Sequence, residues 1–132
     1  MQVGTFLIDR PLYTVTPEET LAQAAALMRK HGHGSASVVT AGEPPGIITE
    51  RDLLRAVADG ADMQTARVAR YMTPKAVTVT PAWHVVDAAR MMIERHFRHL
   101  VVVDESGAVL GVLSIRDMTK ALLEERHGIL AG

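Results

Sequence analysis

The chain has 132 residues, of which 48 % are hydrophobic and 22 % are charged, with a formal net charge of −1 and no cysteine. This length suits one compact domain or two very small ones, and the apolar share argues against wholesale disorder. The charge balance lacks the basic excess of nucleic-acid-binding proteins, and the absence of cysteine excludes disulfides, thiolate catalysis and cysteine-based zinc sites.

The first predicted elements are a short strand and a helix. Residues 14–15 are β-branched, which favours an extended strand. Thr16 followed by Pro17 predicts a helix N-cap with proline at the first helical position, and Glu19 would complete a capping box. Apolar residues then recur on one helical face, and Gly32 is expected to end the helix.

Two more strands and a second helix are predicted next. Residues 36–39 form a nearly unbroken apolar run, which indicates a strand buried on both faces. A turn at 42–45 leads into another strand and then into the heptad GIITERD at 46–52. Apolar residues at helical spacing continue to about residue 57, and the segment 61–72 is predicted to be a helical link.

The second half of the chain repeats the first. Residues 13–17 match 77–81, and the triplet 37–39 matches 101–103, each pair being 64 residues apart. A second heptad, GVLSIRD at 111–117, follows the first by 65 residues, so one residue has been added in the turn before it. Several matches in one register predict two copies of a single supersecondary unit.

Each heptad carries polar side chains where a strand is expected to turn into a helix. The hydroxyl, arginine and aspartate residues are Thr49, Arg51 and Asp52 in the first copy and Ser114, Arg116 and Asp117 in the second. One interpretation is structural, because a hydroxyl three residues before an acid forms a capping box and complements the helix dipole. The other is a nucleotide site, in which helix amides and arginine bind phosphate and the carboxylate accepts hydrogen bonds from a ribose diol.

Other patterns argue against catalysis and metal binding. The sequence has no nucleophile paired with a base, no phosphate-binding Walker loop and no metal-ligand motif, and the pair His96 and His99 lacks further ligands. The N-terminus has no basic region before a sustained apolar run, and no apolar run approaches the roughly 20 residues that span a bilayer. We therefore expect a cytoplasmic protein that is not an enzyme and binds neither metal nor membrane.

With these motifs the chain resembles a tandem pair of CBS motifs, named for cystathionine β-synthase and often called a Bateman module. The resemblance covers almost the whole chain and rests on the two heptads, on RHLVVVD at 98–104 and on YMTP at 71–74. It implies an α+β fold of two pseudo-symmetric β-α-β-β-α motifs packed sheet to sheet. The first motif, with the N-terminal segment, would occupy residues 1–64, and the second, with a C-terminal helix, residues 65–132.

The resemblance also implies a function. Such modules are commonly non-catalytic sensors that bind AMP, ADP, ATP or S-adenosylmethionine in two clefts between the motifs, and they commonly form homodimers through their helices. We expect an adenosine nucleotide as a regulatory ligand, no required cofactor and an effector protein acted on in trans. The alternative is a dimerisation or interaction scaffold without a ligand, in which the heptads only cap helices.

Family positions carried over to this chain give two sets of candidate ligand-binding residues. One cleft would use Thr49, Arg51 and Asp52 with Ala76, Val77, Arg98, His99 and Val101, and the other Ser114, Arg116 and Asp117 with Leu12, Tyr13, Gly34, Ser35 and Ser37. Where the first set has Arg98 and His99 to meet phosphate, the second has Gly34 and Ser35. We therefore expect the cleft of Asp52 to bind a charged nucleotide more tightly.

Overall fold

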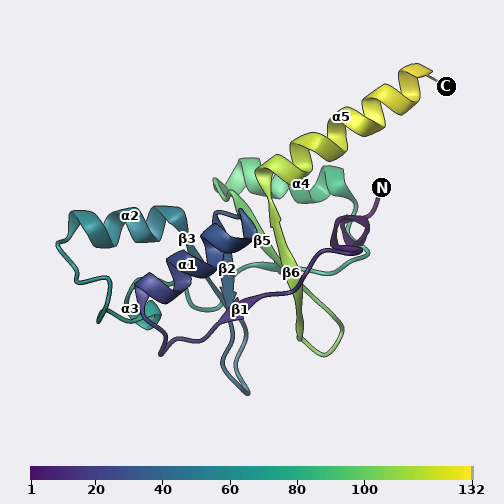
Figure 1. Ribbon diagram of the computed structural model, residues 1–132. Helices are drawn as coiled ribbons and strands as arrows, with labels where there is room; N and C mark the ends of the chain where they lie inside the picture. Colours follow the sequence, from purple (N-terminus) through teal and green to yellow (C-terminus); the bar gives the residue numbers. More distant parts are fainter. Residues whose placement is uncertain (132) are drawn as a thin grey trace. The chain divides into compact units, whose positions relative to one another are not determined.

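The structure is a computed structural model that describes residues 1–131, with the side chains of residues 1–124. The chain forms two compact units, one of residues 12–76 and the other of residues 1–11 together with 77–132. Figure 1 shows the elements of both units in the colours of the sequence. None of the helices in the described part of the chain is long and apolar enough to cross a membrane.

Both units contain the same succession of strand, helix, two strands and helix. The unit 12–76 has β1 (Thr14–Val15), α1 (Leu21–His31), β2 (Ser35–Val38), β3 (Gly46–Thr49), α2 (Glu50–Ala58) and the short α3 (Val68–Tyr71). The other unit has the 3₁₀ turn η1 (Val3–Leu7), β4 (Thr78–Val79), α4 (Val85–Arg95), β5 (His99–Val103), β6 (Val109–Ser114) and α5 (Ile115–Ala131).

Each unit has a three-stranded mixed sheet with the same pairing. The strand orders are β1-β2-β3 and β4-β5-β6, and the middle strand pairs in parallel with the first and antiparallel with the third. Thr14 lies opposite Ser37, and Thr78 lies opposite Val101, so the repeat of 64 residues is kept in the strand register. The predicted α+β fold of two β-α-β-β-α motifs is confirmed.

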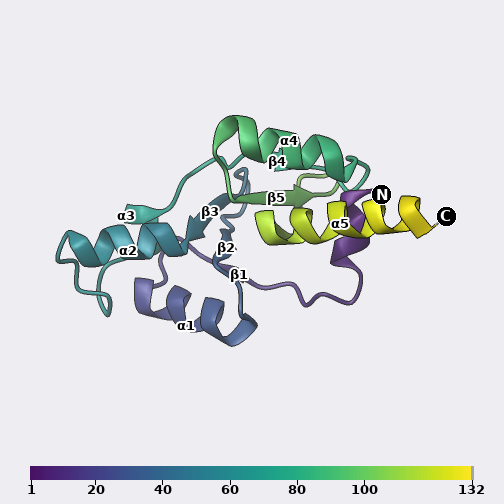
Figure 2. The ribbon, with the colours of Figure 1, turned by 90° about the horizontal axis from the view of Figure 1, so that it is seen from above.

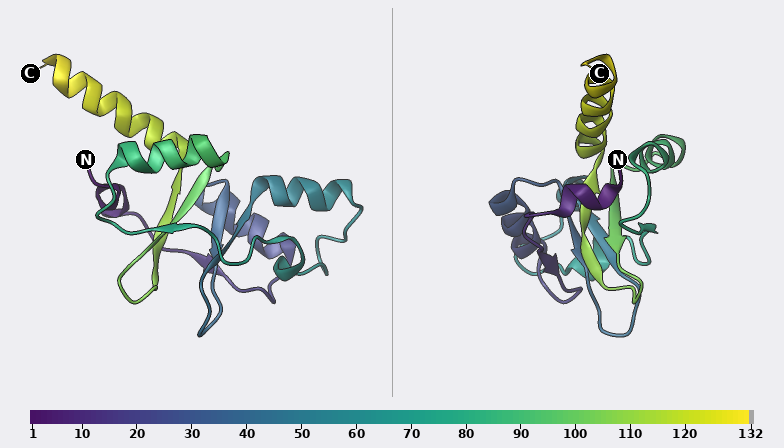
Figure 3. Two further views of the ribbon diagram at one scale, coloured as in Figure 1. Left: turned by 180° about the vertical axis from the view of Figure 1, so that it is seen from behind. Right: turned by 90° about the vertical axis from the view of Figure 1, so that its right-hand side faces the viewer.

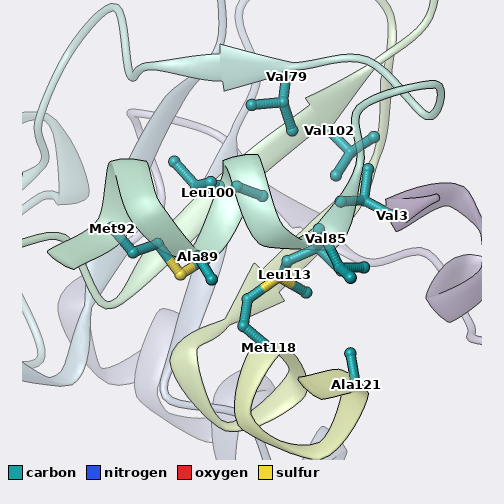
Figure 4. Packing of buried hydrophobic residues seen from close by; sticks show 11 residues of the cluster. Val3, Val79, Val85, Ala89, Met92, Leu100, Val102, Leu113, Met118 and Ala121 are labelled. Atoms are coloured by element: carbon teal, nitrogen blue, oxygen red, sulfur yellow. The ribbon is translucent and has the colours of Figure 1, made fainter. Parts of the chain in front are cut away.

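A hydrophobic core lies between the sheet and the helices within each unit. In the unit of β4–β6, Leu100 and Val102 of β5 pack with Leu113 of β6, Met92 of α4 and Met118 of α5, and all five are essentially inaccessible to solvent (Figure 4). Because side chains alternate along a strand, Val101, which lies between Leu100 and Val102, faces the opposite side of the sheet. Burying each large apolar side chain contributes about 1.5–3 kcal/mol before the entropy of ordering is subtracted.

The second core repeats this arrangement around β2 with fewer large side chains. Its buried members are Val15, Leu21, Ala24, Met28, Ala36, Val38, Ile48, Ala56, Val68 and Tyr71. The apolar runs predicted to be buried strands correspond to β2 and β5, in which residues 36–38 and 100–103 are buried. Val39, at the end of the first run, lies beyond β2 and is 38 % exposed.

The start of α1 differs from the prediction. The helix begins at Leu21 with Thr20 as its N-cap, and Thr20 forms a capping box with Gln23. Thr16 and Glu19 also form a reciprocal pair, in which the Thr16 N–H donates to Glu19 Oε1 and the Glu19 N–H to the Thr16 carbonyl, both at 3.2 Å. That pair closes a turn ahead of the helix, so the assignment of Thr16 as the cap was wrong by four residues.

The helix α4 likewise begins four residues later than the repeated threonine–proline pair, Thr80–Pro81, would suggest. This helix begins at Val85, and its N-cap is His84, whose Nδ1 accepts the Val86 N–H at 3.1 Å. Thr80 instead closes a turn, since its carbonyl accepts the Trp83 N–H at 3.1 Å. By contrast, Gly32 ends α1 as predicted, in the left-handed conformation with φ of 68°.

The segment ahead of each motif is bonded to the other motif. The Val3 and Gly4 N–H groups donate to the Trp83 and Pro81 carbonyls at 2.8 and 3.0 Å. Figures 2 and 3 show this purple N-terminal turn beside the start of α4 in the same unit. Backbone bonds therefore hold residues 1–11 to the second motif, in the compact unit that also contains residues 77–132.

The segment that links the motifs is bonded to the first of them in the same manner. The Val68 and Ala69 N–H groups donate to the Glu19 and Pro17 carbonyls at 2.8 and 3.0 Å, which repeats the contacts of the N-terminal segment. Only Val68–Tyr71 of the predicted helical link 61–72 is helical. The preceding residues form turns whose carbonyls accept hydrogen bonds from the first turn of α1.

Candidate functional site: two strand-to-helix corners

The first corner lies where β3 ends and α2 begins. Thr49 is the N-cap of α2, and its Oγ1 accepts the Asp52 N–H at 3.3 Å. In return Asp52 Oδ2 accepts the Thr49 N–H at 2.8 Å and the Thr49 hydroxyl at 3.1 Å. The two side chains thus form the capping box that the heptad indicated, and the structural interpretation of the heptad holds here.

The other oxygen of Asp52, Oδ1, has a weaker partner. Arg55 Nη2 lies 3.4 Å from it, and the same nitrogen donates to the Tyr71 carbonyl at 3.0 Å. The Arg55 side chain is 56 % exposed, whereas Asp52 is a buried residue. Because capping uses only Oδ2, Oδ1 keeps the capacity to accept a further hydrogen bond from a hydroxyl group.

The second corner, between β6 and α5, is capped in the same way. Ser114 Oγ accepts the Asp117 N–H at 3.1 Å, and Asp117 Oδ2 accepts the Ser114 N–H at 2.8 Å. This carboxylate also forms a two-pronged ion pair with Arg10, with Nη1–Oδ2 at 3.0 Å and Nη2–Oδ1 at 2.9 Å. Both Asp117 oxygens are therefore engaged, which distinguishes this corner from the first.

The electrostatics of Asp117 follow from these partners. Burial opposes ionisation of the carboxyl group, but hydrogen bonds from Arg10 and the Ser114 N–H, together with the positive charge of Arg10, outweigh it. The net effect lowers the pKa of Asp117 below its ordinary value of 3.8. The carboxylate is consequently ionised at neutral pH, and the ion pair with Arg10 is fully charged.

Backbone bonds fasten the neighbouring strand to each corner. The Gly34 carbonyl accepts the Glu50 N–H at 2.9 Å, and the Arg98 carbonyl accepts the Ile115 N–H at 2.8 Å. A Cβ on Gly34 would lie 2.9 Å from Glu50 Oε1, so the absence of a side chain there makes room for the Glu50 carboxylate. Gly34 and Arg98 are thus equivalent in backbone geometry and differ in what they present beside the corner.

The strand register brings further candidate residues beside each corner. Ser35 of β2 lies opposite Thr49 of β3, and His99 of β5 lies opposite Ser114 of β6. Within each unit the structure therefore groups the heptad with the residues that precede and begin the middle strand.

The remaining candidates differ in exposure. Arg51, Arg116, Arg98 and Leu12 are exposed, Ala76 and Val77 are half-buried, and Ser37 and Val101 are buried. Among the described residues, Ser37 Oγ is buried without a hydrogen-bond partner. The exposed arginines are placed to meet an anion from solvent, while the buried hydroxyl of Ser37 is an unmet polar group that a ligand could satisfy.

Tyr13 belongs to a small aromatic cluster that the sequence pattern did not reveal. Its ring stacks on His31 with centroids 4.2 Å apart and planes 6° apart. Its hydroxyl donates to the Ser35 carbonyl at 2.8 Å and lies 2.8 Å from His33 Nδ1.

Arg10 is the functional residue that sequence reasoning missed. It lies 107 residues from Asp117, and no spacing rule joins such distant positions. The described residues contain no group of three histidine, aspartate, glutamate or cysteine side chains placed to hold a metal ion. Each corner thus consists of a capped carboxylate, a neighbouring arginine and the ends of two strands of its own unit.

Comparison with known proteins identifies the family. Residues 3–59 and 68–124 each match the CBS domain family. An uncharacterised 17.7 kDa protein of Acidianus ambivalens is 40 % identical over 86 % of this chain and 68 % of its own length.

Two solved structures are similar over most of the chain. A protein with CBS domains from Burkholderia ambifaria has a TM-score of 0.84 and 32 % identity, over 94 % of this chain and 95 % of its own. A CBS domain protein of Pyrobaculum aerophilum, solved in complex with AMP, has a TM-score of 0.79 and 31 % identity, over 89 % of both chains. The repeat, the two equal sheets and these matches together show that the chain belongs to the CBS domain family and contains two CBS motifs in tandem.

Proposed function

We propose that the chain is a non-catalytic regulatory module that binds an adenosine nucleotide and conveys its occupancy to a separate protein. The observation that carries this proposal is the buried Asp52 carboxylate, which caps α2 with one oxygen and keeps acceptor capacity on the other. The Pyrobaculum relative, 31 % identical, was solved with AMP, which supports an adenosine nucleotide as the ligand class.

The chemistry of the first corner suits the sugar and phosphate of a nucleotide. Asp52 Oδ1 can accept a hydrogen bond from a ribose hydroxyl, as a charge-assisted bond of the stronger kind. The N-terminus of α2 carries a partial positive charge, and the exposed Arg51 adds a full one. A phosphate near this helix end would be favoured by both, so the corner selects for an anionic sugar phosphate over a free base.

Two further parts of the proposal come from the family resemblance. The candidate residues of each set, including Ala76, Val77, Arg98 and His99, complete the binding surface around base and phosphate. The sequence-based expectation that Asp52 belongs to the tighter site stays part of the proposal, but its basis in Arg98 does not, because within the units Arg98 lies beside the corner of Asp117 and Gly34 beside that of Asp52. Binding would act on a partner only if the two functional states of the module differ in affinity for the nucleotide.

A ligand-free dimerisation scaffold is the second candidate function. It is favoured by two large apolar side chains one turn apart on α2 that lie outside the core: Leu54 and Val57 are 69 % and 60 % exposed. Exposed apolar side chains grouped on helices are typical of association surfaces. A protein can both dimerise and bind nucleotide, so the experiment that separates the two functions must show whether nucleotide binds at all.

The test is isothermal titration with AMP and ATP, accompanied by thermal unfolding, on the parent chain and on Asp52→Asn. The asparagine oxygen can still accept the Thr49 N–H, which preserves the cap, but its NH₂ group replaces the acceptor at Oδ1. We expect binding in the parent chain and a loss of about 10- to 100-fold in Asp52→Asn, the range for one charge-assisted hydrogen bond.

Asp87→Asn is the matched control, because Asp87 is an exposed acid in the first turn of α4 and lies outside both corners. It should bind nucleotide like the parent chain. Saturating nucleotide should also raise the unfolding temperature of the parent by mass action. If AMP, ADP, ATP and S-adenosylmethionine all leave that temperature unchanged, the scaffold function replaces the sensor.

A further inference from the structure

We infer that Arg10 is a specificity-determining residue that occupies the Asp117 carboxylate and reserves nucleotide binding for the corner of Asp52. This inference rests on the proposed function. It adds that the two corners, although built from the same heptad, differ in occupancy, and that a single arginine outside the repeat causes the difference.

The contact between Arg10 and Asp117 engages both oxygens of the carboxylate that a ribose would have to approach. The two guanidinium nitrogens lie 3.0 and 2.9 Å from the two carboxylate oxygens, and Nη1 also donates to the Val112 carbonyl at 3.3 Å. Both side chains are about one-fifth exposed, so the pair is shielded from much of the surrounding water. Fork-to-fork pairs of this kind are among the strongest polar contacts in proteins, and a sugar diol must displace one to bind.

The position of Arg10 is fixed by the fold. Its N–H donates to the Leu7 carbonyl at 3.2 Å across a turn in which Asp9 adopts a left-handed φ of 62°. Leu7 packs on Gly111, where an added Cβ would lie 2.8 Å from Leu7 Cδ2. The missing side chain of Gly111 therefore lets the N-terminal segment approach β6 closely, which places Arg10 beside Asp117.

The first corner also has a segment packed against its heptad glycine, but no arginine of that segment forms an ion pair with Asp52 among the described residues. There the residues against the heptad glycine, Gly46, are Met72 and Thr73, which belong to the linker. Lys75 follows Arg10 by the same 65 residues that separate the two glycines, and its side chain is exposed. Among the described residues, the ion pair of Asp52 is made by Arg55 of its own helix, at 3.4 Å.

The consequence is a fixed order of occupancy. AMP should fill one site per chain, at Asp52, and should reach Asp117 only at a concentration higher by roughly 10- to 100-fold, the cost of displacing one charge-assisted pair. Removing the guanidinium should abolish this difference, because the Asp117 carboxylate would then resemble that of Asp52, with one oxygen in the cap and one open.

The experiment is isothermal titration of AMP into the parent chain, Arg10→Ala, and Arg10→Ala combined with Asp117→Asn. We expect one site per chain in the parent, two in Arg10→Ala, and one again in the combined variant. Arg90→Ala is the matched control, since Arg90 is an exposed arginine on α4 of the same unit, and it should keep one site. Circular dichroism and the unfolding temperature of each variant verify that it is folded.

A second readout needs no nucleotide. Carboxyl-detected NMR titration of Asp117 should show a higher pKa in Arg10→Ala than in the parent chain, because the cation that favours ionisation is gone. Two equal sites in the parent, an unchanged site number in Arg10→Ala, or weaker AMP binding in that variant would each overturn the inference while leaving nucleotide binding intact. If neither the parent nor Arg10→Ala binds AMP, the proposed function and this inference are both wrong.

Discussion

The buried hydroxyl of Ser37 should lower the stability of the protein that carries it. Ser37 has no solvent exposure, and within the described part of the chain its Oγ has no hydrogen-bond partner. At the equivalent position of the other motif stands Val101, which is equally buried and needs no partner. We therefore predict that Ser37→Ala stabilises the chain against unfolding, which is the opposite of the usual effect of a core substitution.

The magnitude follows from the two changes that the substitution makes. Removing an unsatisfied buried hydroxyl gains about 1–3 kcal/mol, and losing the contacts of one oxygen returns up to about 1 kcal/mol. The net gain is about 1 kcal/mol. A chain of 132 residues has an unfolding entropy of about 0.28 kcal/mol/K, so this gain corresponds to a rise of roughly 3–4 °C in unfolding temperature.

Urea denaturation and calorimetry of the parent chain, Ser37→Ala and Ser106→Ala provide the assay. Ser106 is exposed, and its hydroxyl donates to Asp104 Oδ1 at 2.6 Å, so the same substitution there should be neutral or slightly destabilising. If Ser37→Ala lowers the free energy of unfolding by about 1 kcal/mol or more, the hydroxyl is satisfied in the folded protein and the reasoning fails.

Further predictions concern the heptad glycines and the acid dependence of stability. Gly46→Ala should lower the free energy of unfolding by about 1–3 kcal/mol, because its Cβ would lie 2.7 Å from the Thr73 carbonyl oxygen. Gly111→Ala should lower it less, because its Cβ would meet only the end of the Leu7 side chain. Urea denaturation of both variants measures the two losses, and equal losses would contradict the prediction. The lowered pKa of Asp117 stabilises the fold above the unfolded value near 4 and ceases to do so as pH falls through the folded value. Arg10→Ala should therefore be less stable than the parent at pH 7, with a gap that narrows below about pH 4, and a gap independent of pH would contradict the ion pair.

Local patterns predicted the repeat, the buried strands and the capped corners. Residues 36–38 and 100–103 are mostly apolar because both faces of a middle strand are buried, and this requirement is visible in the sequence itself. The capping boxes at Asp52 and Asp117 could likewise be predicted from the sequence, because residues three positions apart lie close together at the start of a helix. Such predictions succeed where the partners are neighbours in the chain.

Predictions failed where distant segments decide the local structure. Thr16 and Pro17 have the composition of a helix start, yet α1 begins at Leu21, where the N–H groups of its first turn are bonded to carbonyls of residues 63 and 66. The contact of Arg10 with the second corner spans most of the chain and has no local signature. That Asp52 Oδ1 takes no part in the cap could be recognised only from the hydrogen-bond distances in the structure.

The central claim is that a carboxylate at the first corner binds the hydroxyls of a nucleotide's ribose. The most direct test compares the dissociation constants of AMP and 2′-deoxy-AMP for the parent chain in one titration series. The account predicts that AMP binds at least about tenfold more tightly, since the deoxy sugar lacks the 2′-hydroxyl and can offer Asp52 only the 3′-hydroxyl as a donor. Equal affinities for the two nucleotides, or no measurable binding of either, would contradict it.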